Sequence, residues 1–250
     1  MRASSSTRAT IGMAVFALVM SAALASLGVW QLQRGEQKHA LMKALDERLA
    51  AAPVDLPPHS EWTHLNRTDD EFRRVRFAAT YENKPDAMVY TSGSAVRSDV
   101  TTPGVWAFLP AQLENGARIV INTGFVPNEM QKRDEEDRAI APLLNGEPAV
   151  LTGYLRFPER PGLLTAQEST TKRLWFVRDI AGMAEALGWG EVAPFYIDLE
   201  APVPTAGVPK PSALSPKLKD NHLGYAITWF GLAIAVLGTF GVWLFGRRRA

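Results

Sequence analysis

Two long runs of uncharged, mainly apolar residues stand at the two ends of this sequence, and a polar stretch separates them. The first run covers residues 9–33 and is flanked by Arg8 and Arg34, and the second covers residues 223–246. A helix of about 20 apolar residues crosses roughly 30 Å of hydrocarbon. The pattern therefore predicts a membrane protein with a two-helix transmembrane hairpin, formed by residues 11–33 and 223–246.

Positive charges at both termini predict the orientation of this hairpin. The first tail, residues 1–10, contains Arg2 and Arg8 and no acidic residue, and the last tail, residues 247–250, contains three arginines. Such residues stay on the cytoplasmic side, so both termini are predicted to be cytoplasmic and residues 34–220 to form an exported domain. We expect a multi-pass protein of the bacterial inner membrane with a periplasmic domain. The alternative location of the domain is the mitochondrial intermembrane space. The first tail is too short for a typical mitochondrial transit peptide, which favours the bacterial location.

A cleaved signal peptide is a second interpretation of the first apolar run. The tripeptide Ala23-Leu24-Ala25 fits a small-x-small cleavage site. Against cleavage, the uncharged run continues beyond this site, and Trp30 stands where an interfacial anchor is expected. The domain is exported under both interpretations.

Short strand-like runs dominate the predicted domain. Asn115-Gly116 is a hairpin turn signal between two of them. Two helices are expected at residues 35–51 and 180–187, the first as a continuation of the first membrane helix. We predict an exported α+β domain dominated by antiparallel strands, as a sheet or a partial barrel. The strands are expected at residues 72–81, 87–96, 105–113, 118–126, 149–157, 174–177 and 195–199.

Two further segments of the domain have simple expected roles. Residues 132–138, KRDEEDR, are a charge run typical of a solvated loop or helix face. Residues 201–216 are rich in proline and predict a semi-rigid linker that leads back to the membrane.

Small residues recur along both apolar runs and predict close packing of the two helices. In the second run they are Gly224, Gly231 and Gly238, each seven residues from the next. Small residues let helix backbones approach closely in lipid. The first run offers Ser21, Ala25 and Gly28 in the same role.

Composition excludes several classes of function. The formal net charge is +1, so the sequence does not predict a nucleic-acid partner. The absence of cysteine excludes disulfides, thiolate metal sites and thiol catalysis. The sequence contains no phosphate-binding loop, dinucleotide glycine fingerprint or nucleophile elbow, and we do not expect an enzyme.

The four histidines differ in their surroundings. His59 and His64 lie in a proline-rich stretch with poor metal-ligand spacing, and His39 lies on a charged helical face, so all three are expected at the surface. His222 stands at the predicted headgroup level at the start of the second apolar run. On a helix it would share a face with Tyr225 and Trp229.

A matching polar face ends the first apolar run, at the same predicted membrane surface. It contains Gln31, Arg34 and Lys38, close to Trp30. Imidazole ligates iron, arginine and lysine pair with carboxylates such as haem propionates, and aromatic rings cover a macrocycle. The same residue types are typical anchors at the lipid interface, and their spacing alone leaves both roles open.

Several segments resemble one known family. LGVWQLQRGEQK after the first apolar run and NHLGYAITWF at the second resemble the two signatures of the surfeit locus protein 1 family, the Surf family of cytochrome c oxidase assembly factors. FRRVRFAATYE, TPGVWAFLPAQLENGARIVINTGFVP, VLTGYLRFPER and LWFVRD resemble its segments in the same order. The resemblance extends over residues 27–235.

The resemblance implies a role in building haem-copper cytochrome c oxidase, at the stage where haem a enters subunit I. It implies haem a as the cofactor, His222 as the iron ligand, and subunit I and haem a synthase as partners. Arg34 and Lys38 would meet propionates, Trp30, Tyr225 and Trp229 would line the ring, and Gln31 is expected in the same cofactor-binding set. Whether one chain or a homo-oligomer holds the haem stays open. The alternative is a haem-free membrane protein that stabilises subunit I during assembly.

Two positions depart from the family pattern. Gln37 stands where a tryptophan is frequent in the family. Phe125 takes the place of the tryptophan in a Gly-Trp-Val-Pro-like turn, here at residues 122–127. We expect the fold to tolerate both residues, and the resemblance gives haem contact at these two positions less support.

Overall fold

The computed structural model describes residues 3–128, 133–162, 165–216 and 221–249. Arg2 and Lys132, which entered the charge patterns of the sequence, lie outside these residues. The chain divides into two compact units. A helical unit comprises Met1–Ala44 and Leu218–Ala250, and a sheet unit comprises Leu45–Lys217.

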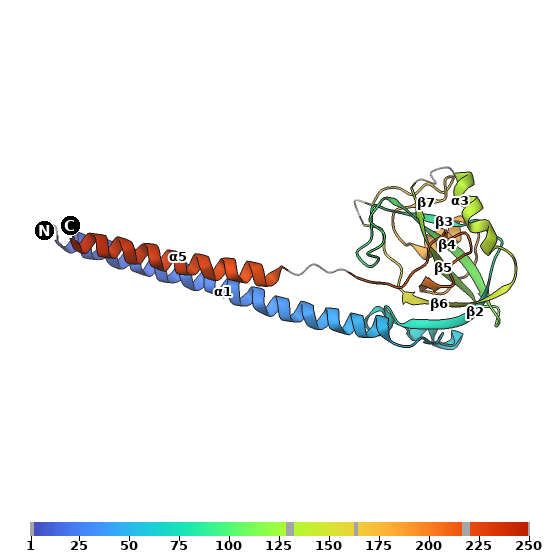
Figure 1. The fold of residues 1–250 in the computed structure, drawn as a ribbon, viewed down its shortest axis with the longest axis horizontal. Coiled ribbons are helices and arrows are strands. Elements are labelled where there is room, and N and C mark those ends of the chain that lie inside the picture. Colours follow the sequence, from blue (N-terminus) through green and yellow to red (C-terminus); the bar gives the residue numbers. More distant parts are fainter. Residues whose placement is uncertain (1–2, 129–132, 163–164, 217–220, 250) are drawn as a thin grey trace. The chain divides into compact units, whose positions relative to one another are not determined.

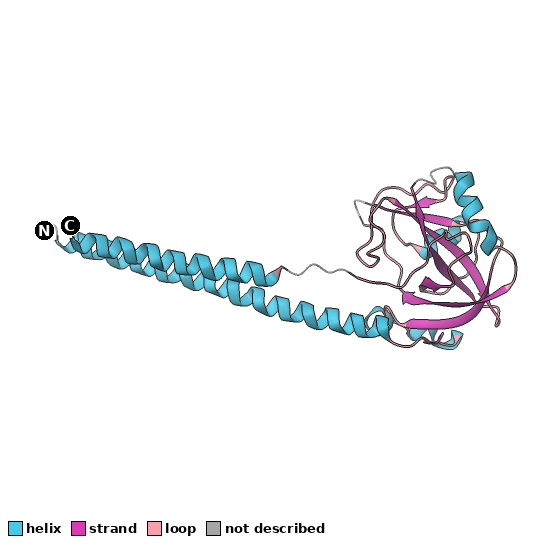
Figure 2. Ribbon diagram, in the orientation of Figure 1, coloured by secondary structure: helices cyan, strands magenta, loops and turns pink. Residues whose placement is uncertain are grey.

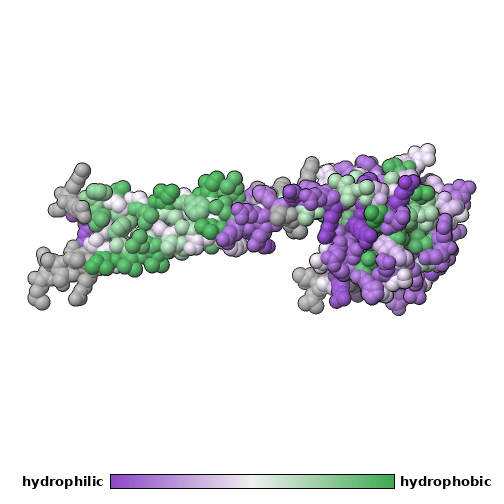
Figure 3. Space-filling model, turned by 90° about the horizontal axis from the view of Figure 1, so that it is seen from below, coloured by the Kyte–Doolittle hydropathy of each residue, from purple (hydrophilic) through white to green (hydrophobic). Residues whose placement is uncertain are grey.

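Two antiparallel helices form the helical unit. They are α1, Ala3–Ala50, and α5, His222–Arg249, and they lie side by side with the two chain termini at the same end (Figure 1). Each is long and apolar enough to cross a membrane. Apolar residues cover most of the visible surface of the pair, and polar residues gather at one end of it (Figure 3). The helix predicted at residues 35–51 is the continuation of α1.

Small residues form the contact between α1 and α5. The Ser21 hydroxyl donates a hydrogen bond to the Ala233 carbonyl at 3.1 Å. A Cβ atom on Gly28 would lie only 2.7 Å from the Phe230 ring, so the absence of a side chain makes room for that ring. The buried small residues are Ala17, Ser21, Gly28 and Gly35 on α1 and Ala226 and Ala233 on α5.

The prediction that the glycines of α5 make this contact is wrong. Gly224, Gly231 and Gly238 are exposed, and a Cβ on any of them would meet nothing within 4 Å. Ala226 and Ala233 are also seven residues apart and occupy the face turned toward α1. On α1, Ser21 and Gly28 do make the predicted contact.

The sheet unit is built on one eight-stranded sheet with the order β1-β2-β6-β8-β5-β4-β3-β7. Strands dominate it, with short helices between them (Figure 2). The strands are β1 Val54–Asp55, β2 Arg74–Tyr81, β3 Ala87–Thr91, β4 Gly104–Leu113, β5 Arg118–Pro127, β6 Pro148–Arg156, β7 Leu174–Trp175 and β8 Tyr196–Ala201. The short helices are η1 His59–His64, α2 Arg67–Asp70, α3 Arg133–Ile140, η2 Ala141–Leu143 and α4 Ile180–Ala186.

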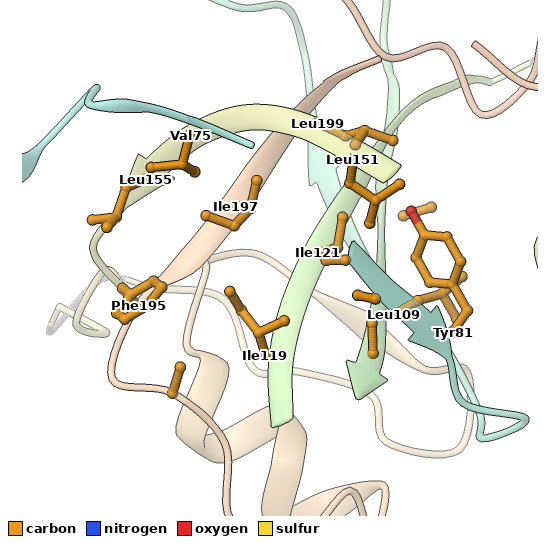
Figure 4. Close-up of a cluster of buried hydrophobic side chains, with 14 of the residues drawn as sticks. Val75, Tyr81, Leu109, Ile119, Ile121, Leu151, Leu155, Phe195, Ile197 and Leu199 are labelled. Carbon is orange, nitrogen blue, oxygen red and sulfur yellow. The ribbon is translucent and has the colours of Figure 1, made fainter. Parts of the chain in front are cut away.

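An additional pairing between β2 and β4 closes five of these strands, β2, β6, β8, β5 and β4, into a small barrel. Its interior is filled by aliphatic and aromatic side chains, among them Leu109, Ile121, Leu155 and Ile197, each with no exposed surface (Figure 4). The pairings β1–β2, β3–β7 and β5–β8 are parallel, and the others are antiparallel. The sheet-rich domain flanked by two apolar helices agrees with the prediction.

Two local predictions for this unit are wrong. Residues 122–127 are not a turn but the second half of β5. Residues 201–216 are not a free linker but a strap along the sheet, because Lys210 exchanges two backbone hydrogen bonds with Phe125, at 2.8 and 3.1 Å. The Ser215 amide also donates to the Val96 carbonyl at 2.8 Å, and Leu214 is buried.

Gly124 makes the close approach of this strap possible. Its φ is +133°, and an added Cβ would lie 2.3 Å from the Lys210 carbonyl carbon. Gly116 in the hairpin turn also has a positive φ, +83°, but an added Cβ there would meet nothing within 4 Å. The two glycines therefore share the conformational constraint and differ in the steric one.

We predict that Gly124→Ala destabilises the protein more than Gly116→Ala does. Alanine at a positive φ costs about 1 kcal/mol or more in either variant, and only Gly124→Ala also pushes against the strap. Thermal unfolding of the full chain in detergent measures the difference. Equal melting temperatures for the two variants would contradict the steric role of the strap.

Candidate functional site

The structure brings His222 at the start of α5 against Gln31 on α1. His222 Nδ1 and Gln31 Oε1 are 2.7 Å apart. Because an amide oxygen only accepts, Nδ1 donates the hydrogen bond, and in a neutral ring this leaves Nε2 as the nitrogen with a free lone pair. A second group that orients an imidazole in this way is typical of histidines that ligate metals.

Gly35 lets the two helices approach at this end. An added Cβ on Gly35 would lie 3.3 Å from the His222 Cβ, which is tighter than an ordinary contact. Gly35 is itself buried. The contact between His222 and Gln31 thus depends on a small residue one turn further along α1.

The other predicted site residues divide between two environments. Lys38 and Trp229 are half-buried. Trp30 and Tyr225 are exposed over 54% and 56% of their surface. The predicted site residues therefore extend beyond the surface at which α1 and α5 touch. Arg34 is exposed and donates a hydrogen bond to Gln37 at 3.3 Å. Gln37 therefore holds this guanidinium.

The remaining histidines are at the surface, as predicted: His39, His59 and His64 are all exposed. Among the described residues, no group of three or more His, Cys, Asp or Glu side chains could hold a metal ion. Any metal at His222 must therefore bring most of its own ligands, as haem iron does.

Sequence reasoning missed a buried polar cluster in the sheet unit, centred on Arg156 at the end of β6. Its guanidinium donates to Glu71 at 2.7 Å and to Asp198 at 2.5 Å. The Asn122 amide donates to the other Asp198 oxygen at 2.7 Å. The Phe72 ring lies 4.5 Å below the guanidinium.

Two more arginines extend this cluster. Arg178 donates to Glu159 at 2.7 Å, and Arg97 holds Asp99 with two hydrogen bonds at 2.8 and 2.9 Å. Both lie near the Trp106 ring, whose centroid is 5.5 Å from the Arg97 guanidinium and 6.0 Å from that of Arg178. Each arginine thus has its own carboxylate.

The pKa shifts in this cluster follow from burial and pairing. Burial works to lower the pKa of Arg156, but the charges of Asp198, Tyr196 and Glu71 outweigh it and raise that pKa. The hydrogen bonds from Arg97 lower the pKa of Asp99. Arg156 and Asp99 therefore keep their charges at neutral pH.

The cavity inside the cluster is small. It measures about 10 Å³ and is lined by Arg97, Trp106, Asn122, Arg178 and Asp198. That volume accommodates about one water molecule. The cluster is therefore a structural polar core that ties β5, β6 and β8 together, not a ligand pocket.

A second buried ion-pair group corrects the prediction for residues 132–138. Arg133 on α3 pairs with the fully buried Asp86. Asp86 also accepts from Arg173 at 2.7 Å, and Arg173 reaches Asp137 at 2.6 Å. The charge run is thus partly an internal anchor of α3 rather than only a solvated face. Burial raises the pKa of Asp86, and both arginines oppose that rise.

Comparison with known proteins places both units in one family. The SURF1 family model matches residues 18–234, most of both described units. The chain belongs to the SURF1 family. This confirms the resemblance read from the sequence.

Individual SURF1 relatives agree over most of their length. Surfeit locus protein 1 of Rattus norvegicus is 28% identical over 230 residues, covering 88% of this chain and 72% of its own. The Homo sapiens protein is 27% identical over 220 residues, covering 84% and 70%. The Arabidopsis thaliana protein is 23% identical over 255 residues, covering 84% and 71%.

The segments that resemble the family meet at the two places described above. LGVWQLQRGEQK and NHLGYAITWF contain Gln31, Gly35 and His222. VLTGYLRFPER and LWFVRD supply Arg156 and Arg178 to the buried cluster. Charged residues inside otherwise apolar strand runs were the available signal for the cluster, because such residues are buried only with partners.

We predict that Arg156→Met destabilises the sheet unit by about 3–5 kcal/mol, because it leaves the buried carboxylates of Glu71 and Asp198 unpaired. Burial raises the pKa of an unpaired carboxylate. The loss should therefore be full at neutral pH and shrink as the pH falls and these groups become protonated.

Arg67→Met is the matched control, because Arg67 is 58% exposed and lies 3.7 Å from the same Glu71. An exposed pair of this kind contributes about 0–1 kcal/mol. Denaturant unfolding of the full chain at several pH values measures both variants. Equal losses for the two, or a loss independent of pH, would show that Arg156 does not hold charged partners.

Proposed function

We propose that this chain is an assembly factor for haem-copper cytochrome c oxidase, the role by which the SURF1 family is known. The support is the family match over residues 18–234. In this proposal the protein acts on oxidase subunit I and receives its cargo from haem a synthase. It is a binding protein and carries out no reaction of its own.

We infer that α1 and α5 both span the bacterial inner membrane. Their length and apolar composition support this, and the arginines beyond each apolar run favour cytoplasmic termini. The sheet unit is then periplasmic, and His222 and Gln31 stand at the outer end of the helix pair.

We propose that the cargo is haem a and that His222 is its axial ligand. Haem a supplies an iron that accepts an imidazole nitrogen, two propionates and an isoprenoid tail. The observation that carries the proposal is the hydrogen bond from His222 Nδ1 to Gln31, because it favours the tautomer whose Nε2 ligates iron. Arg34 and Lys38 lie on α1 one and two turns beyond Gln31 and would pair with the propionates.

The aromatic residues complete this proposed site. Trp30 and Tyr225 are exposed, and Trp229 is half-buried. Exposed aromatic side chains can cover a flat macrocycle without first leaving a packed core. In a chain without cargo they would face lipid headgroups.

We predict that His222→Ala abolishes haem a binding and that Gln31→Leu weakens it about 10- to 100-fold, the usual cost of removing a group that orients a metal ligand. The full chain, purified from cells that make haem a, is assayed by its Soret band and haem content. His39→Ala is the control, because His39 is an exposed histidine on α1, the helix that contains Gln31. If His222→Ala retains the same haem with the same Soret band, the ligand assignment is wrong.

A second candidate is a haem-free protein that stabilises subunit I through its helices. The observation that favours it is the exposed glycine face of α5, at Gly224, Gly231 and Gly238. In lipid, such a face is suited to close contact with another transmembrane helix.

This candidate predicts that Gly231→Leu impairs oxidase assembly while His222→Ala does not. A Cβ added at position 231 would meet nothing within 4 Å, so an effect of leucine there would report a partner helix. Gly12→Leu, at another exposed glycine with open space around it, is the control. Oxidase spectra of membranes measure assembly, and normal assembly with Gly231→Leu would exclude this role of the glycine face.

A further inference from the structure

A second feature of the helix pair is an apolar groove between α1 and α5, some distance from His222. It has a volume of about 410 Å³. Met13, Phe16 and Ala17 line one side, and residues of α5 between Leu232 and Trp243 line the other. The Thr239 hydroxyl in its lining donates a hydrogen bond to the Ala235 carbonyl at 2.8 Å. Apart from this hydroxyl and the indole N–H of Trp243, the lining side chains are apolar.

The α5 side of this groove continues the row of residues that begins at His222. His222, Trp229, Val236 and Trp243 are each seven residues apart. Residues at this spacing stay on one side of a helix, with a drift of about 20° per step. A second row runs beside it at the same spacing, through Tyr225, Leu232 and Thr239.

The α1 side shows the same relation. Trp30 stands two seven-residue steps from Phe16, Gln31 two steps from Ala17, and Arg34 three steps from Met13. The residues of the proposed haem site and the residues of the groove therefore occupy one lateral side of the helix pair. The site lies at one end of that side and the groove at the other.

We propose that the groove receives the isoprenoid tail of haem a, and that it lets the protein distinguish haem a from haem without a tail. This inference rests on the proposed function, because it assumes haem at His222. Haem a carries its propionates and its tail on largely opposite edges of the ring. Propionates at Arg34 and Lys38 direct the tail along the helices, away from that end and toward Phe16 and Val236.

The position and length of the groove suit one hydrocarbon chain that extends from a haem at His222. Leu232 stands ten residues after His222, about 15 Å along the axis, and the groove extends over the next eleven residues, about 16 Å. The tail begins at the edge of the ring rather than at the iron, which shortens the first distance.

Phospholipid acyl chains share the chemistry of the tail and would fill an unoccupied groove. Lipid is as apolar as the groove, so hydrophobic transfer gives little preference. The tail has a different advantage, because ligation at His222 makes its entry an intramolecular step at high effective concentration. The groove is thus expected to select the haem that carries a tail.

The test compares haem a, haem o and haem b as probes, titrated into the full chain in detergent and followed by the Soret band. Haem o has the tail without the formyl group, and haem b has neither. We expect haem a and haem o to bind with similar affinity and haem b about tenfold more weakly. This pattern separates an effect of the tail from an effect of the formyl group.

Ala235→Trp fills the groove from an exposed position, and Ala22→Trp is the matched control at an exposed alanine outside the groove. Ala235→Trp should bring haem a and haem o to the affinity of haem b and leave haem b unchanged, and Ala22→Trp should change none of the three. Thr239→Phe is a second groove variant. Equal helical content by circular dichroism shows that each variant folds.

Three outcomes overturn the inference. If the wild type binds all three haems equally, the groove does not recognise the tail, while the proposed haem function survives. If Ala235→Trp removes co-purified phospholipid but leaves the affinities for haem a and haem o unchanged, the groove belongs to lipid. If no haem binds the wild type, the proposed function itself fails, and this inference fails with it.

Discussion

Close approach of α1 and α5 at their small residues is the constraint on which the helical unit depends. If the two helices span a membrane, as proposed, they gain little from hydrophobic transfer, and their contact must come from packing and from the hydrogen bonds between them. Gly28 admits the Phe230 ring, and Ser21 bonds to the Ala233 carbonyl. These contacts set the register of the pair, and the register is what brings His222 to Gln31.

A different constraint organises the sheet unit. Segments that are distant in the sequence meet around Arg156. Its buried charge must be paired, and Glu71 and Asp198 supply the partners. A charge that is expensive to bury without partners permits only arrangements in which those partners are present. With the strap held at Gly124, the cluster fixes the end of the barrel more specifically than aliphatic packing alone would.

The sequence predicted the elements that local patterns determine. Alternating strands, the Asn115-Gly116 turn and the two apolar helices all follow from periodicity and turn chemistry, and the structure contains them. The two-residue β1 was missed, because its pairing with β2 is a tertiary contact without a local pattern. For the helix contact, α5 has small residues seven apart on two faces, so the period alone could not decide between Gly231 and Ala233.

For the candidate site, too, the sequence predicted the positions of residues but not their contacts. Residue type and position identified His222 and Gln31 as groups at one end of the pair, but only the register between two distant segments showed that they touch. The buried arginines were missed because the same residue type is usually solvated at a surface. Proline in residues 201–216 suggested a linker, whereas the missing Cβ of Gly124 allows that segment to pack.

The two proposed roles use adjoining faces of α5. Val236 lines the groove, and Gly231, five residues earlier, is about 140° away around the helix. Ala235 also lines the groove and lies only about 40° from Gly231, because four residues span about 400°. A haem tail in the groove and a partner helix at the glycine face would therefore meet near Ala235, so the two proposed roles are not spatially independent.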